Sequence, residues 1–223
     1  MNRITILTGH YGSGKSEFAI NLALRADVDS RELALIDLDI VNPYFRSRER
    51  RSLLEDHGIR VIGNALRQDT GIDIPAISGE INAPLENPQT LTIVDAGGDP
   101  AGARLLGRFR KLLDTGETEM LCVVNASRPE TSTPEKLKEM IRGIEQTSGL
   151  SVRGLVNNTH MLEHTQISHI ERGDALCKEV AGDLDIPIRY VGVFRPLVGD
   201  VPESIDGEIV PISMYLREAW MST

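Results

Sequence analysis

The stretch Gly9-His10-Tyr11-Gly12-Ser13-Gly14-Lys15-Ser16 decides the fold of this sequence. It matches the pattern G-x-x-x-x-G-K-[ST], a loop whose backbone N–H groups surround phosphate oxygens. The match has the context that such a loop requires, because a β-rich run at 4–8 precedes it and a helical pattern at about 15–26 follows it. The sequence therefore predicts a strand, a phosphate-binding loop (P-loop) and a helix at the start of an α/β domain.

Strand and helix patterns alternate along the rest of the chain. The periodicity predicts further strands at 33–37, 59–62, 91–94, 120–125, 152–156 and 188–193, and helices at 47–57, 105–113, 134–148, 165–181 and 214–220. Residues 63–88 are rich in Gly, Pro, Asn and Asp, so we expect an irregular excursion with at most a short helix at 75–81.

This alternation predicts the fold class. The strands are nearly continuous apolar runs, which is typical of a parallel sheet that is covered on both faces. We expect an α/β fold of the P-loop NTPase type, a mostly parallel sheet of about seven strands with helices on both faces. No linker or repeat divides the chain, so residues 1–223 are expected to form a single nucleotide-binding domain.

Composition excludes several classes of protein. Acidic residues outnumber basic ones by 33 to 24, and a net charge of −9 argues against nucleic acid or an anionic membrane as the main partner. The two cysteines, Cys122 and Cys177, have no metal-like spacing, which excludes a disulfide framework or a cysteine-based zinc site. The sequence shows neither a secretory signal nor an apolar run near the length of a membrane span, so we expect a cytoplasmic protein.

Lys15, Ser16 and an aspartate after a later strand are expected to bind the phosphates and a metal ion. Lys15 would bridge the β- and γ-phosphates, and the Ser16 hydroxyl would ligate Mg²⁺. A P-loop also needs a carboxylate that holds the metal or its water, and Asp95 follows the apolar strand at 91–94. Gly97 or Gly98, just after it, is expected to donate a backbone N–H to the γ-phosphate.

Together these motifs resemble those of the MinD/ParA/CobQ/CobB nucleotide-binding family, in the SIMIBI branch of P-loop NTPases. The resemblance covers most of the chain and rests on four segments: the P-loop, Asp37-Leu38-Asp39, Val94-Asp95-Ala96-Gly97-Gly98 and Val156-Asn157-Asn158. It implies that Asp39 polarises the attacking water, that Asn157 contacts the adenine amino group, and that the loop Phe194-Arg195-Pro196-Leu197 covers the base.

The sequence and the resemblance together give a set of candidate site residues. The expected catalytic residues are Lys15 and Asp39, and the expected metal ligands are Ser16 and Asp95. The expected nucleotide contacts are Gly9, Tyr11, Gly12, Ser13, Gly14, Lys15, Ser16, Glu17, Gly97, Asn157, Arg195 and Pro196.

The sequence departs from the family at one position of the P-loop. Members that place the septum or partition DNA carry a second, signature lysine that reaches the partner's phosphate across a dimer, and His10 stands there in this chain. Whether a homodimer forms around the nucleotide is therefore left open. The sequence also lacks an N-K-x-D motif, since the corresponding stretch is Asn157-Asn158-Thr159-His160, which favours ATP over GTP.

Three other features receive structural interpretations. The stretch from His160 to His164 reads H-x-x-E-H, but it follows a strand end, so we expect a loop rather than a zinc helix. The arginines between 46 and 51 are expected to form a solvated helix face. The alternative is that they form a docking surface or bind an anionic substrate. The amphipathic C-terminal stretch is expected to pack against the domain rather than to bind a membrane.

Three functions fit these features. The first is an Mg²⁺-dependent ATPase that acts as a nucleotide-controlled switch or assembly factor, with slow turnover until a protein partner binds. The alternative is a biosynthetic enzyme that transfers phosphate to a small metabolite, as the cobyrinate-amidating and dethiobiotin-forming relatives do, with Arg67 and the arginines at 46–51 binding substrate. The third is a module that binds nucleotide without hydrolysing it.

Overall fold

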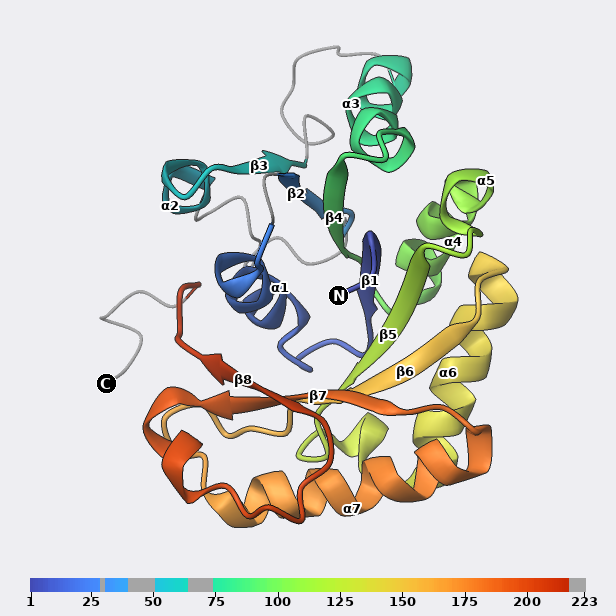
Figure 1. Cartoon of the computed structure of the whole chain (residues 1–223). Helices are drawn as coiled ribbons and strands as arrows, with labels where there is room; N and C mark the ends of the chain where they lie inside the picture. Colours follow the sequence, from blue (N-terminus) through green and yellow to red (C-terminus); the bar gives the residue numbers. More distant parts are fainter. Residues whose placement is uncertain (29–30, 40–50, 64–73, 217–223) are drawn as a thin grey trace.

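The computed structural model describes residues 1–28, 31–39, 51–63 and 74–216. Eight strands form one parallel sheet in the order β3-β2-β4-β1-β5-β6-β7-β8, which curls around α1 (Figure 1). The strands are β1 (Ile4–Thr8), β2 (Glu32–Asp37), β3 (Ile59–Ile62), β4 (Thr90–Asp95), β5 (Thr118–Val124), β6 (Val152–Asn157), β7 (Ile188–Phe194) and β8 (Glu208–Ile212). The predicted α/β fold with a parallel sheet is confirmed.

Helices cover both faces of the sheet. One face packs against α3 (Ile74–Glu86), α4 (Pro100–Arg108), α5 (Arg110–Leu113), α6 (Pro134–Ser148) and α7 (Ile167–Leu184). The other face packs against α1 (Lys15–Arg25) and α2 (Arg51–Asp56). Side chains alternate along each strand, so that Ile6 enters the first core and Leu7 enters the second. None of the described helices is both long and apolar enough to cross a membrane.

The eighth strand was missed by the sequence analysis. β8 is short, lies at the edge of the sheet and contains Pro211, which cannot donate to a strand ladder. An edge strand tolerates such a proline, and β8 still pairs in parallel with β7. It also lies beside α1, where Arg25 donates from Nη1 to the Ile209 carbonyl oxygen (3.0 Å) and pairs with Glu208. The sheet therefore has eight strands rather than about seven.

Two predicted helical regions differ from the structure. α3 extends over Ile74–Glu86 with Pro84 inside it, whereas at most a short helix was expected. Ile81 and Leu85 lie one turn apart and pack into the core, and this packing outweighs the weak helical preference of the segment. The region 105–113 is divided at Phe109 into α4 and α5. The sequence analysis missed Asp99, whose carboxylate accepts from the N–H groups of the first turn of α4.

The structure confirms several local predictions. The side chain of Thr133 caps α6 and Gly149 ends it with a φ of +71°. The stretch from His160 to His164 is a loop between β6 and α7. Residues 214–216 are not helical, and the remainder of the predicted C-terminal helix lies outside the described residues. Arg67 and the arginines at 46–50 lie outside them as well.

Candidate nucleotide site

The P-loop connects β1 to α1 and carries backbone donors toward a cavity. Three glycines of the loop, Gly9, Gly12 and Gly14, have positive φ values of +143°, +77° and +80°. The first hydrogen bond of the helix runs from the Phe18 N–H to the Gly14 carbonyl oxygen (2.9 Å). No side chain caps this helix end, so the first-turn N–H groups and the positive end of the helix dipole suit an anion.

A cavity of about 350 Å³ opens at the carboxyl ends of the strands. Parallel α/β sheets bind their ligands at this edge. The walls come from the P-loop and α1, from the ends of β2, β5, β6, β7 and β8, and from the chain after β8. The lining residues are Tyr11, Gly12, Gly14, Lys15, Ser16, Glu17, Asp39, Arg128, Asn158, His160, Leu162, Thr165, Gly192, Phe194, Ile212, Met214 and Leu216.

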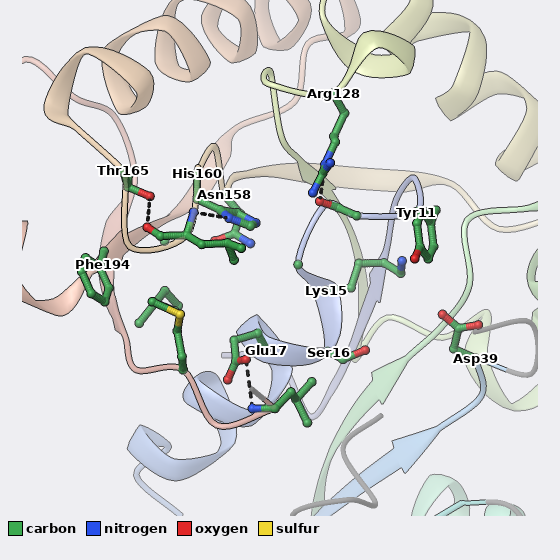
Figure 2. Close-up of a pocket in the computed structure, with 17 residues that line it drawn as sticks. Tyr11, Lys15, Ser16, Glu17, Asp39, Arg128, Asn158, His160, Thr165 and Phe194 are labelled. Carbon is green, nitrogen blue, oxygen red and sulfur yellow. Dashed lines mark hydrogen bonds between the residues drawn. The ribbon is translucent and has the colours of Figure 1, made fainter. Parts of the chain in front are cut away.

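Lys15, Ser16 and Asp39 lie together at one end of this cavity (Figure 2). All three are nearly buried, with exposed fractions of 6%, 9% and 7%. The Lys15 ammonium makes one long hydrogen bond, from Nζ to the His10 carbonyl oxygen (3.4 Å). The structure thus brings the carboxylate of Asp39, from the end of β2, to the ammonium and the hydroxyl of the adjacent residues Lys15 and Ser16 beside the amides of the P-loop.

Asp95, the other predicted metal ligand, lies at the end of β4, which is paired with β2 and β1. It pairs in register with Asp37 of β2, and is completely buried. The Asp37 Oδ1 accepts from the Asp39 backbone N–H (3.1 Å) and so fixes the turn that presents Asp39. Asp95 does not line the cavity. Gly97 lies close by, since a β-carbon there would be 3.5 Å from the Asp39 Oδ1.

The structure places Asn158, rather than Asn157, in the cavity. Asn157 is fully buried on the α7 side, where its Nδ2 donates to the Ile170 carbonyl oxygen (3.0 Å) and its Oδ1 accepts from the Thr159 N–H (3.2 Å). Asn158 instead donates from Nδ2 to the Ser13 carbonyl oxygen of the P-loop (2.7 Å). Asn158 therefore lines the cavity, whereas the predicted contact residue Asn157 does not.

Arg195 and Pro196 also lie outside the cavity lining. They begin a 3₁₀ turn over Arg195–Asp200 and are exposed. Arg195 donates from Nε to the Ser213 hydroxyl oxygen (2.9 Å), which ties the turn to the chain after β8. Phe194, just before them, does line the cavity. The predicted base-covering loop thus contributes its first residue.

Arg128 and Asn125 are site residues that the sequence analysis did not identify. Arg128 follows β5 and donates from Nε to the Gly12 carbonyl oxygen (3.1 Å), so its guanidinium lies against the P-loop. Asn125 is buried and donates to the carbonyl oxygens of Gly12 (3.4 Å) and His160 (3.3 Å). Its place directly after a buried strand, like that of Asn158 after β6, is the sequence signal that was available.

Comparison with known proteins supports the fold. No protein-family model matches the sequence, and no curated protein sequence matches it either. The cell division protein FtsY from Thermotoga maritima is a structural neighbour, with 21% identity and a TM-score of 0.58 over 85% of this chain and 61% of that one. The likeness shows that this chain shares the α/β fold of that protein.

Two further FtsY structures agree with this assignment. Chloroplast FtsY from Physcomitrella patens has a TM-score of 0.58 at 16% identity, over 97% of this chain and 63% of its own. The signal recognition particle receptor FtsY from Elizabethkingia anophelis, in complex with GDP, has a TM-score of 0.55 at 16% identity, over 86% and 58%. This chain spans less than two thirds of each neighbour, and at such identities the likeness concerns the fold.

Proposed function

We propose that this chain is an Mg²⁺-dependent ATPase that acts as a nucleotide-controlled switch, in the MinD/ParA/CobQ/CobB branch of its class. One observation carries the proposal: Lys15, Ser16 and Asp39 are buried together beside the P-loop, at one end of a cavity of about 350 Å³. Phosphoryl transfer in P-loop proteins depends on positioning and on electrostatic stabilisation, and these groups supply both.

The residues present fit Mg²⁺ held together with a nucleotide. Mg²⁺ prefers oxygen ligands and commonly combines one or two protein groups with substrate phosphates and waters. The Ser16 hydroxyl and the Asp39 carboxylate lie beside the P-loop amides at one end of the cavity, which suits such shared coordination. The Ser16 hydroxyl would ligate the ion, whereas Asp95, the other predicted ligand, is completely buried outside the cavity lining and is not assigned this role. When bound, Mg²⁺ would neutralise charge on the phosphates.

Asp39 and Arg128 have distinct proposed roles. Asp39 would orient and polarise the attacking water at the Lys15 end of the cavity. Arg128 would place a second positive charge over the P-loop, where the septum-placing relatives use the lysine that His10 replaces. Among the described residues that line the cavity, one is a lysine, Lys15, and one is an arginine, Arg128. The Arg128 guanidinium is fixed by its hydrogen bond to the Gly12 carbonyl oxygen.

The other end of the cavity favours adenine over guanine. Guanine presents N–H donors on its Watson–Crick edge, which a carboxylate accepts well. Two of the described lining residues carry a carboxylate, Asp39 and Glu17. Asp39 lies at the phosphate end, and the Glu17 carboxylate already accepts from two backbone N–H groups. Asn158 has a side-chain oxygen that can accept from an exocyclic amino group. The GDP complex of the E. anophelis FtsY makes GTP the alternative to test.

A protein partner is favoured over a small-molecule acceptor. One structural neighbour is a signal recognition particle receptor, a protein whose name states a macromolecular partner. The test is phosphate release from Mg-ATP, with size-exclusion light scattering of the Asp39→Ala protein in ADP and then in Mg-ATP. An ATP-specific change of assembly supports the switch. Turnover that requires a small metabolite would instead support the biosynthetic enzyme.

A further inference from the structure

The chain after β8 is fastened to the first turns of the P-loop helix. Glu17 lies two residues after Lys15, and its carboxylate accepts from the backbone N–H groups of Tyr215 (2.5 Å) and Leu216 (3.1 Å). One turn later, Asn21 donates from Nδ2 to the Ser213 carbonyl oxygen (2.9 Å) and accepts at Oδ1 from the Ser213 N–H (2.8 Å). These four hydrogen bonds join residues that are almost two hundred positions apart.

Burial and the carboxylate acceptor both strengthen these hydrogen bonds. Asn21 is nearly buried, with an exposed fraction of 5%, and the two polar atoms of its amide bond both backbone groups of Ser213. Hydrogen bonds to a charged carboxylate, such as that of Glu17, are roughly twice as strong as neutral ones. Arg195 also donates from Nε to the Ser213 hydroxyl oxygen (2.9 Å). Residues 213–216 are thus held both by α1 and by the turn after β7.

The fastened segment is also a wall of the nucleotide cavity. Met214 and Leu216 line it, next to Ile212 at the end of β8. The lining also includes Leu162 and Phe194, and Figure 2 shows Phe194 at the end of the cavity away from Asp39. Apolar side chains therefore face the part of the cavity that lies farthest from the phosphate-binding groups. A flat heterocycle is the part of a nucleotide that such a surface accepts.

We propose that residues 213–216 form the base-binding wall of the cavity, and that Glu17 is a positioning residue that couples this wall to the P-loop. The inference rests on the proposed function and deepens it, because it assigns the base to a segment other than the Arg195–Pro196 turn. Glu17, which holds the wall, and Ser16, which is expected to ligate the metal ion, are adjacent residues in the first turn of α1. Nucleotide affinity should therefore depend on Glu17, whereas affinity for a ligand without a base should not.

The experiment compares two ligands by calorimetry: Mg-ATP, and inorganic tripolyphosphate with Mg²⁺. Glu17→Ala is expected to weaken Mg-ATP binding by about tenfold and to change tripolyphosphate binding by no more than about twofold. Glu17→Gln keeps one acceptor oxygen and should recover part of the loss. Met214→Ser should reproduce the ATP-selective loss without touching α1. Glu179→Ala, on the exposed face of α7, is the matched control.

The outcomes separate this inference from the proposed function. Equal losses of both ligands in Glu17→Ala would show that Glu17 supports only the P-loop and would overturn the inference, as would unchanged Mg-ATP binding. In both cases the wild-type protein still binds Mg-ATP and the proposed function stands. Failure of the wild-type protein to bind either ligand would overturn both. Thermal unfolding of each variant checks that the protein is folded.

Discussion

A β-carbon on Gly98 would lie 2.3 Å from the carbonyl oxygen of Gly9, so the loop after β4 packs directly on the backbone of the P-loop. Gly9 is equally constrained, because a β-carbon there would lie 2.3 Å from the carbonyl oxygen of Val123. The atoms that these β-carbons would meet belong to the backbone, which cannot move aside as the end of a flexible side chain can. The shape of the P-loop is therefore set by the strand ends on either side of it.

Gly98→Ala should distort the P-loop and weaken Mg-ATP binding by at least about tenfold, since the added methyl meets backbone rather than a movable side chain. The control is Gly143→Ala within α6, where a β-carbon meets nothing within 4 Å. That change should raise the free energy of unfolding by about 0.5–1 kcal/mol, because alanine is the better helix former. Equal nucleotide affinity in the two variants would contradict the backbone contact.

The identity of the base can be tested directly. We expect ADP to bind more tightly than GDP, by about tenfold or more, in an equilibrium titration of the wild-type protein. Asn158→Ala should reduce this preference and also loosen the P-loop, because Asn158 donates to the Ser13 carbonyl oxygen. Asn157→Ala should lower the stability of the protein instead, because its amide bonds hold the start of α7. Tighter binding of GDP would overturn the assignment of ATP.

Arg128→Ala should lower the turnover of Mg-ATP by about a hundredfold, with a smaller effect on ADP affinity, if its charge is used in the transition state. Arg128→Lys keeps the charge but loses the planar fork, and should recover only part of the rate. Arg172→Ala removes a nearby exposed arginine that bonds the Ser127 hydroxyl, and it should leave turnover unchanged. A rate in Arg128→Ala equal to that of the wild type would restrict Arg128 to a structural role.

Burial raises the pKa of Cys122 from 9.0 to about 12, and burial also raises the pKa of Cys177. Both thiols therefore stay protonated and enclosed at pH 8, and a disulfide reagent should label them only as fast as the protein unfolds. Below pH 9 the Cys122 thiol is protonated in the folded and the unfolded protein alike. As the pH rises from 9 toward 12 the folded state loses stability, because the thiol ionises more readily in the unfolded chain. Rapid labelling of the native protein at pH 8 would contradict this burial.

Much of the fold followed from the sequence because apolar strands and the P-loop are local signals. The strand at Ile59–Ile62 was predicted with the bounds that the structure has, and the cap at Thr133 was read correctly. β8 was missed because Pro211 interrupts its apolar pattern, and α3 was underestimated because the packing of Leu85 is tertiary. The pairing of β8 with β7 and the packing of Leu85 in the core both join distant segments, so local periodicity could not predict them.

The candidate site was less predictable for a related reason. Successive residues at a strand end point to opposite sides, so the sequence alone could not decide between Asn157 and Asn158. Arg128 bonds Gly12 across 116 positions, and Glu17 bonds Leu216 across 199. No spacing rule connects such residues. The P-loop residues, by contrast, act within a few positions of one another, and their grouping was predicted.

Phosphate release from Mg-ATP, measured together with nucleotide binding in three proteins, tests the central claim most directly. The wild-type protein should bind Mg-ATP and release phosphate slowly. Lys15→Ala should lose binding because the phosphates lose their main cation, whereas Asp39→Ala should bind normally and release none. Wild-type hydrolysis rates in Asp39→Ala, or a wild-type protein that binds no nucleoside triphosphate, would contradict the account.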